Sequence, residues 1–106
     1  MHCVNHGYRV QEAAEIKKRI TNEDYVSSLF KRLIDALNKV PTGALTLNTI
    51  NANQSFARAF FIDGVDGALT HVSWLISSLR KQPENSTNGE VLEIARKVAN
   101  TLQLEW

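Results

Sequence analysis

Three side chains that can bind a metal ion, His2, Cys3 and His6, lie within the first six residues. The spacing from Cys3 to His6 is one that a zinc site can use. A structural zinc site takes four ligands, however, and the adjacent residues His2 and Cys3 cannot easily bind one ion together. The only distant histidine or cysteine is His71. We therefore expect neither a metal site nor a cofactor.

Four glutamates form two E-x-x-E pairs, a pattern from which helical carboxylate sites for metal ions are built. The pairs are Glu12 with Glu15 and Glu90 with Glu93. At about 100° per helical residue, all four carboxylates lie beside or opposite the apolar stripes of their predicted helices. This placement indicates surface glutamates, so a small metal-dependent hydrolase is the third of our functional hypotheses.

No other enzyme motif is present. The sequence contains no glycine-rich loop with a lysine, no H-E-x-x-H and no G-x-S-x-G. Asp63 and Asp66 flank glycines as in a calcium loop, but the alternating ligands and the closing glutamate of such a loop are absent. These observations favour a non-enzymatic protein, and we assign no catalytic residue.

A resemblance to the helix-turn-helix motif covers residues 57–75. Gly64-Val65 followed by Val72-Ser73-Trp74-Leu75 resembles its turn and second helix. The spacing departs from the motif by about two extra residues, and no lysine or arginine precedes Arg80 in the second helix. A nucleic-acid-binding regulator is therefore the second hypothesis. The resemblance implies that a recognition helix presents these residues to a DNA groove: Thr70, His71, Ser73, Trp74 and Ser77.

The composition is that of an ordinary globular protein. The 106 residues fit one domain over residues 1–106, and 43% of them are hydrophobic and 22% charged, which argues against intrinsic disorder. The formal net charge of +1 is too small to attract nucleic acid or anionic lipid over a distance. The single cysteine fits a reducing compartment, and no apolar run approaches the roughly 20 residues that span a bilayer. We expect a cytoplasmic protein without a membrane partner.

Three segments carry apolar residues at helical spacing and are predicted to be helices: 23–39, 66–81 and 89–103. Each has one apolar stripe to bury, and Pro41 marks the end of the first. Polar residues that favour helix starts stand at the N-termini: Thr21 with Asp24 as a capping box for the first, Asp66 as N-cap of the second, and Thr87 with Glu90 as a capping box for the third.

The remaining segments give weaker predictions. Residues 9–20 and 53–62 have the spacing of shorter helices, whereas 44–50 alternates apolar and polar residues and is expected to be an extended connector or a helical turn. Glycine and proline mark 63–67 and 81–88 as loops. Together these elements predict an all-α protein, a compact bundle of four to five amphipathic helices.

The most informative single residue is Trp74, which lies about 160° from Val72 around its predicted helix and so points away from the apolar stripe. Either another part of the chain covers it, such as segment 44–50, or it contacts a partner. Phe61 lies about 100° from Phe60 and has the same two alternatives. The candidate partner-binding residues are Trp74, Phe61, Thr70, Ser77, Ser78 and Lys81.

By elimination of catalytic and metal motifs, the first hypothesis is a small helical protein that acts by protein–protein binding. The expected partner is another protein or a second copy of this chain. A homodimer would provide cover for aromatic side chains that a single small bundle cannot bury.

Overall fold

The computed structural model describes residues 12–83 and 87–106. Residues 12–17 are helical, and a single 3₁₀ turn, Thr42–Ala44, precedes the third helix. No strand occurs in these described ranges, so the prediction of an all-α protein is confirmed. The longer helices are α2 (Glu23–Lys39), α3 (Leu47–Ala68), α4 (Val72–Arg80) and α5 (Gly89–Leu102).

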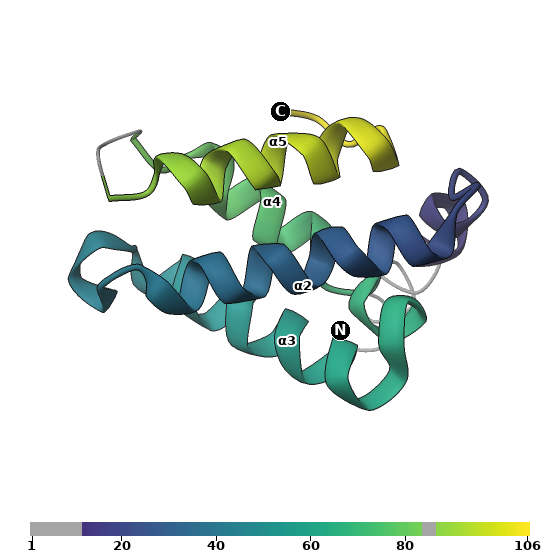
Figure 1. The fold of residues 1–106 in the computed structure, drawn as a ribbon, viewed down its shortest axis with the longest axis horizontal. Helices are drawn as coiled ribbons and strands as arrows, with labels where there is room; N and C mark the ends of the chain where they lie inside the picture. The colour runs from purple at the N-terminus through teal and green to yellow at the C-terminus, as the bar shows by residue number, and fades with distance from the viewer. Residues whose placement is uncertain (1–11, 84–86) are drawn as a thin grey trace, which may run out of the picture.

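The four longer helices surround one core. Helix α2 packs against α3 and α5, and α4 also packs against α3 and α5. Figure 1 shows α2 lying between α5 and α3, with α4 behind them. The ring of Phe30 on α2 meets two rings of α3 edge to face, Phe56 at 5.0 Å and Phe60 at 6.0 Å between centroids. These edge-to-face contacts join α2 to α3 within the core, because the two rings of α3 lie one turn apart on the same face of that helix.

Helix α2 has the predicted bounds but a different N-cap. The side chain of Asn22, rather than Thr21, accepts a hydrogen bond of 3.1 Å from the backbone N–H of Tyr25. The helix ends before Pro41, where Val40 turns to an extended backbone. Prediction of the helix was correct because its apolar stripe is long, whereas two adjacent polar residues could serve as the cap.

Helix α3 is much longer than predicted. Thr46 caps it by accepting a hydrogen bond from the backbone N–H of Thr49. The second half of segment 44–50, for which an extended connector or a helical turn was expected, is therefore the first turn of this helix. The expected loop at residues 63–67 is reduced to one non-helical residue, Gly64, with φ 70° and ψ −152°. Only glycine adopts this backbone readily, and the helix resumes after it.

The predicted helix over residues 66–81 is wrong at its start. Asp66 belongs to the last turn of α3 and forms an ion pair of 2.6 Å with Lys17 instead of capping a helix. The turn at residues 69–71 separates it from α4, whose first residue is Val72. Gly67 lets the last turn of α3 pack closely against the turn that carries Asp63, since a Cβ at position 67 would lie 2.6 Å from the Cβ of Asp63.

Helix α5 agrees with its prediction except at its ends. The N-cap is Asn88, without a side-chain capping hydrogen bond, so the expected capping box of Thr87 with Glu90 is wrong. Gln103 adopts a left-handed backbone (φ 57°) and ends the helix. Trp106 therefore lies beyond the end of α5 and does not continue its apolar stripe. The guanidinium of Arg96 lies 5.4 Å from the centroid of the Trp106 ring.

No helix within the described part of the chain combines the length and the apolar character that crossing a membrane requires.

Candidate protein-interaction surface

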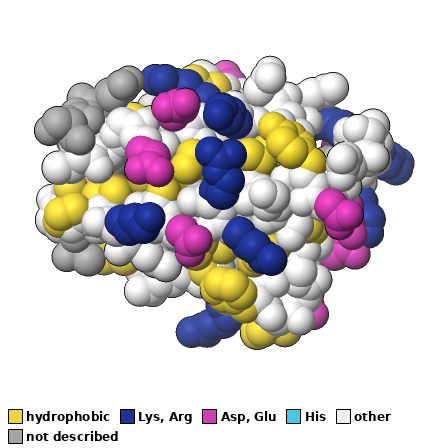
Figure 2. Space-filling view, viewed as in Figure 1, with side chains coloured by type: hydrophobic (Ala, Val, Ile, Leu, Met, Phe, Trp, Pro, Cys, Tyr) yellow, Lys and Arg dark blue, Asp and Glu magenta, His cyan; other side chains and the backbone are white. Residues whose placement is uncertain are grey.

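Large apolar side chains are exposed mainly on α3. Across the described residues, Leu47, Phe61 and Ile62 of this helix are 72%, 71% and 71% exposed, and the other large apolar residues classed as exposed are Tyr25 and Trp106. In Figure 2, apolar side chains stand out at the lower part of the viewed face, where Figure 1 draws α3. Phe61 therefore lies outside the core, and of its two alternatives the cover by its own chain is wrong.

Five of the exposed side chains of α3 follow one line along the helix. Successive members are four, three, four and three residues apart, the spacing that keeps positions on one face. This face lies opposite the buried rings of Phe56 and Phe60. We call this line the outer seam, and it consists of Leu47, Asn51, Gln54, Arg58 and Phe61, all of them exposed.

A groove of about 410 Å³ runs beside the outer seam. Two small residues of α3, Ser55 and Ala59, lie one turn apart in its lining. Ile62 lines it at one end, and His71 from the turn before α4 also contributes. Small side chains in a row let another helix approach closely, because they leave space between larger neighbours.

These features are the observations on which a function can be based. No protein family, curated protein or solved structure matches this chain significantly. The charged residues give no stronger signal: Figure 2 shows basic and acidic side chains interspersed on the viewed face. An interspersed pattern does not produce the single-sign field that attracts a polyanion.

Trp74, the residue that the sequence analysis singled out, is half-buried against the core. Its indole N–H donates a hydrogen bond of 3.0 Å to the side-chain oxygen of Asn48. Asn48 belongs to the segment 44–50 that was considered as an intrachain cover, and it provides that cover from the first turn of α3. The contact accounts for the tryptophan within one chain; its contribution to partner binding stays a prediction.

The predicted neighbours of Trp74 do not form one surface. Ser78 is buried, and its hydroxyl donates to the carbonyl oxygen of Leu75, so its expected exposure is wrong. The half-buried Thr70 donates likewise to the carbonyl oxygen of Gly67. Lys81 is exposed at the end of α4. The buried face of α4 is wider than its apolar stripe, because Ser78 lies beside the buried Leu75 and Leu79.

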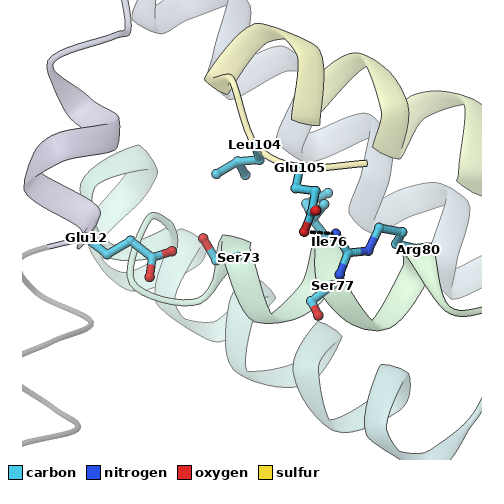
Figure 3. Close-up of a pocket in the computed structure, with 7 residues that line it drawn as sticks. All are labelled: Glu12, Ser73, Ile76, Ser77, Arg80, Leu104 and Glu105. Atoms are coloured by element: carbon cyan, nitrogen blue, oxygen red, sulfur yellow. Dashed lines mark hydrogen bonds and ion pairs between the residues drawn. The ribbon is translucent and has the colours of Figure 1, made fainter.

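Ser77 instead lines a second hollow, of about 490 Å³, between α4 and the C-terminal segment. Figure 3 shows the carboxylate of Glu12 directed toward Ser73, while Glu105 meets the guanidinium of Arg80 in an ion pair. The cation of this hollow is therefore already bound to a carboxylate of the same chain. The remaining lining residues are Ile76 and Leu104.

The glutamate pairs do not converge. Glu12 lines the second hollow, whereas Glu15, Glu90 and Glu93 are exposed, with Glu93 lying 3.9 Å from Lys97 along α5. The described residues contain no group of three or more His, Cys, Asp or Glu side chains placed to hold a metal ion. The N-terminal set of His2, Cys3 and His6 lies outside the described residues.

The side chains that the helix-turn-helix resemblance would present to DNA have other contacts. The indole of Trp74 is hydrogen-bonded to Asn48 of α3, and Ser73 and Ser77 line the hollow that contains Glu12 and Glu105. Two carboxylates beside a recognition helix would repel phosphate groups.

Sequence reasoning missed the outer seam. Leu47 was assigned to a segment expected to be an extended connector or a helical turn, so its place on the same helix face as Phe61 was not recognised. The signal was present, because polar and apolar residues repeat at helical spacing from Leu47 to Phe61.

Proposed function

We propose that this chain is a small helical protein-binding module whose contact surface is the outer seam together with Ile62. The observation that carries the proposal is the exposure of three large apolar side chains on one helix face, each to more than two thirds. Scattered apolar residues are ordinary on protein surfaces, but the adjacent and highly exposed pair Phe61 and Ile62 lies beside a groove, which supports a contact site there. Aromatic anchors such as Phe61 are enriched at the centres of such sites.

The energetics favour a contact that uses the whole face. Burying one large apolar side chain completely contributes about 1.5–3 kcal/mol. Association costs about 4–15 kcal/mol in lost freedom of motion, so one phenylalanine does not hold a complex. Leu47 and Phe61 at the two ends of the seam, with Ile62 beside Phe61, supply the several contacts that a partner needs.

The proposal can be tested by site-specific photo-cross-linking in the cells that make the protein. A photoreactive residue replaces Gln54, which is exposed in the middle of the seam, and a matched control replaces Asp35, which is exposed on α2. We expect a covalent adduct with a protein from position 54, whether with a second copy or with another protein, and none from position 35. An absence of adducts at position 54, or equal adducts at both positions, contradicts the proposal.

A further inference from the structure

We infer that the partner of the outer seam is a second copy of this chain, packed with the two α3 helices antiparallel and Gln54 at the two-fold axis. This inference rests on the proposed function and names the partner for that surface. It follows from the order of side chains along the seam, from their charges and from the adjoining groove.

The outer seam has nearly the same pattern in both directions. Leu47 lies seven residues before Gln54 and Phe61 seven residues after it, with polar side chains between. When two such helices run antiparallel about Gln54, Leu47 of each copy lies opposite Phe61 of the other. A two-fold axis perpendicular to the helices requires such a reversible order, because each patch then meets its own copy in reverse. The pairing produces two apolar contacts, one at each end of the seam, in which Leu47 of one copy covers Phe61 of the other. The side-chain amides of the two Gln54 residues face each other between these contacts.

The charge on the seam selects the antiparallel direction over the parallel one. Arg58 is exposed and is the seam's charged residue. In a parallel pair the two Arg58 guanidinium groups would face each other, a like-charge contact that opposes association. In the antiparallel pair Arg58 lies beside Asn51 of the second copy. The two Arg58 residues are then about 12 Å apart along the axis, at 1.5 Å per residue.

The groove beside the seam suits the same arrangement. Alternating steps of three and four residues are the spacing of helices that cross at about 20° and interlock their side chains. In the antiparallel register Leu47 of the second copy arrives next to Phe61 and Ile62. There the groove is lined by the small side chain of Ala59. An apolar side chain can therefore enter between Ile62 and the turn that carries His71.

The size of the surface predicts a weak dimer. A standard specific interface buries about 800 Å² on each partner, which is roughly an eighth of the 6485 Å² that this chain exposes. The seam from Leu47 to Phe61 is about 21 Å long at 1.5 Å per residue, so one helix pair covers less than that standard. We expect a dissociation constant in the micromolar range or weaker, with the dimer fraction rising with protein concentration.

Disulfide cross-linking tests both the partner and the register. Cys3 is the single cysteine, so a Cys3→Ser background allows one thiol to be placed at a chosen position. Under mild oxidation Gln54→Cys is expected to form a disulfide-linked dimer. Arg58→Cys alone is expected to remain monomeric, because a disulfide requires Cα atoms within about 7 Å. A mixture of Asn51→Cys and Arg58→Cys chains is expected to form the mixed dimer.

Two controls separate the outcomes. Ser28→Cys places an exposed thiol on α2, and its disulfide yield sets the background for random collision. Efficient self-linking of Arg58→Cys would overturn the antiparallel arrangement, and yields at position 54 no higher than at position 28 would overturn the second copy as partner. If position 54 gives no more disulfide than position 28, a photo-adduct from position 54 with a different protein still supports the proposed function. The absence of any adduct would overturn both the second copy as partner and the proposed protein-binding surface.

Discussion

Truncation of Trp74 is expected to destabilise the fold rather than to remove a partner contact. Replacing a fully buried tryptophan by alanine costs about 3–5 kcal/mol. Trp74 is half-buried, so we expect Trp74→Ala to lower the free energy of unfolding by about 2 kcal/mol. For a domain of this size each 1 kcal/mol lowers the melting temperature by about 4–8 °C, which gives a decrease of roughly 8–16 °C.

The hydrogen bond to Asn48 can be separated from the packing of the ring. Trp74→Phe retains most of the apolar contact and removes the indole donor, and Asn48→Ala removes the acceptor. Each is expected to cost about 0.5–1.5 kcal/mol, the net value of one hydrogen bond. The double variant should cost less than the sum, because both changes remove the same interaction.

Urea denaturation followed by circular dichroism at 222 nm measures all four variants against the wild type. Additive effects of Trp74→Phe and Asn48→Ala would refute the hydrogen bond. If Trp74→Ala had the unfolding midpoint of the wild type, the claim that the Trp74 ring stabilises the fold would be refuted. Trp74 would then again be a candidate for contact with a partner.

Two further predictions concern the end of α3. Gly64→Ala is expected to cost about 1–3 kcal/mol, because φ 70° with ψ −152° strains any residue with a Cβ, although no atom lies within 4 Å of that Cβ. Gly89→Ala is the matched control in open space, and equal unfolding midpoints for the two would contradict this explanation. The hydrogen bond from Lys17 to Asp66 raises the pKa of the Lys17 amine above 10.5. Asp66→Asn is therefore expected to lower that pKa in an NMR titration. In the wild type the stability that this pair provides is present below about pH 10.5 and is lost as the pH rises through the raised pKa.

The sequence predicted those helices whose apolar stripe is long and uninterrupted. Helices over residues 23–39 and 89–103 were predicted because their apolar side chains repeat at helical spacing over several turns, and the structure has helices at Glu23–Lys39 and Gly89–Leu102. Their N-caps were less certain, since adjacent polar residues compete for the same role, and Asn22 and Asn88 occupy the cap positions instead of the predicted residues.

The break between α3 and α4 was misplaced for a physical reason. Glycine at positions 64 and 67 favoured a loop there, but one glycine absorbs the whole change of direction and the other allows close packing within the helix. The chain then leaves the helix at residues 69–71, which contain no glycine or proline. Tertiary packing determines this boundary, and local residue preferences do not reveal it.

The candidate surface was only partly predictable. For Phe61 the sequence left burial by its own chain and contact with a partner both open, and its 71% exposure excludes the burial. Leu47 was missed because the alternation around it suggested an extended connector or a single helical turn rather than the start of a long helix. The cover of Trp74 by Asn48 depends on the antiparallel return of α4 along α3, a contact between residues 26 positions apart.

Sedimentation equilibrium of the wild type and of a Leu47→Ser/Phe61→Ser variant tests the central claim most directly, with Tyr25→Ser as a control at another exposed apolar position. At concentrations up to about 1 mM, the range in which weak dimers form, we predict that the wild type and Tyr25→Ser associate to dimers. The double variant should remain monomeric with an unchanged helical spectrum. A wild-type chain that sediments as a monomer throughout, or a double variant that associates as strongly as the wild type, would contradict the account.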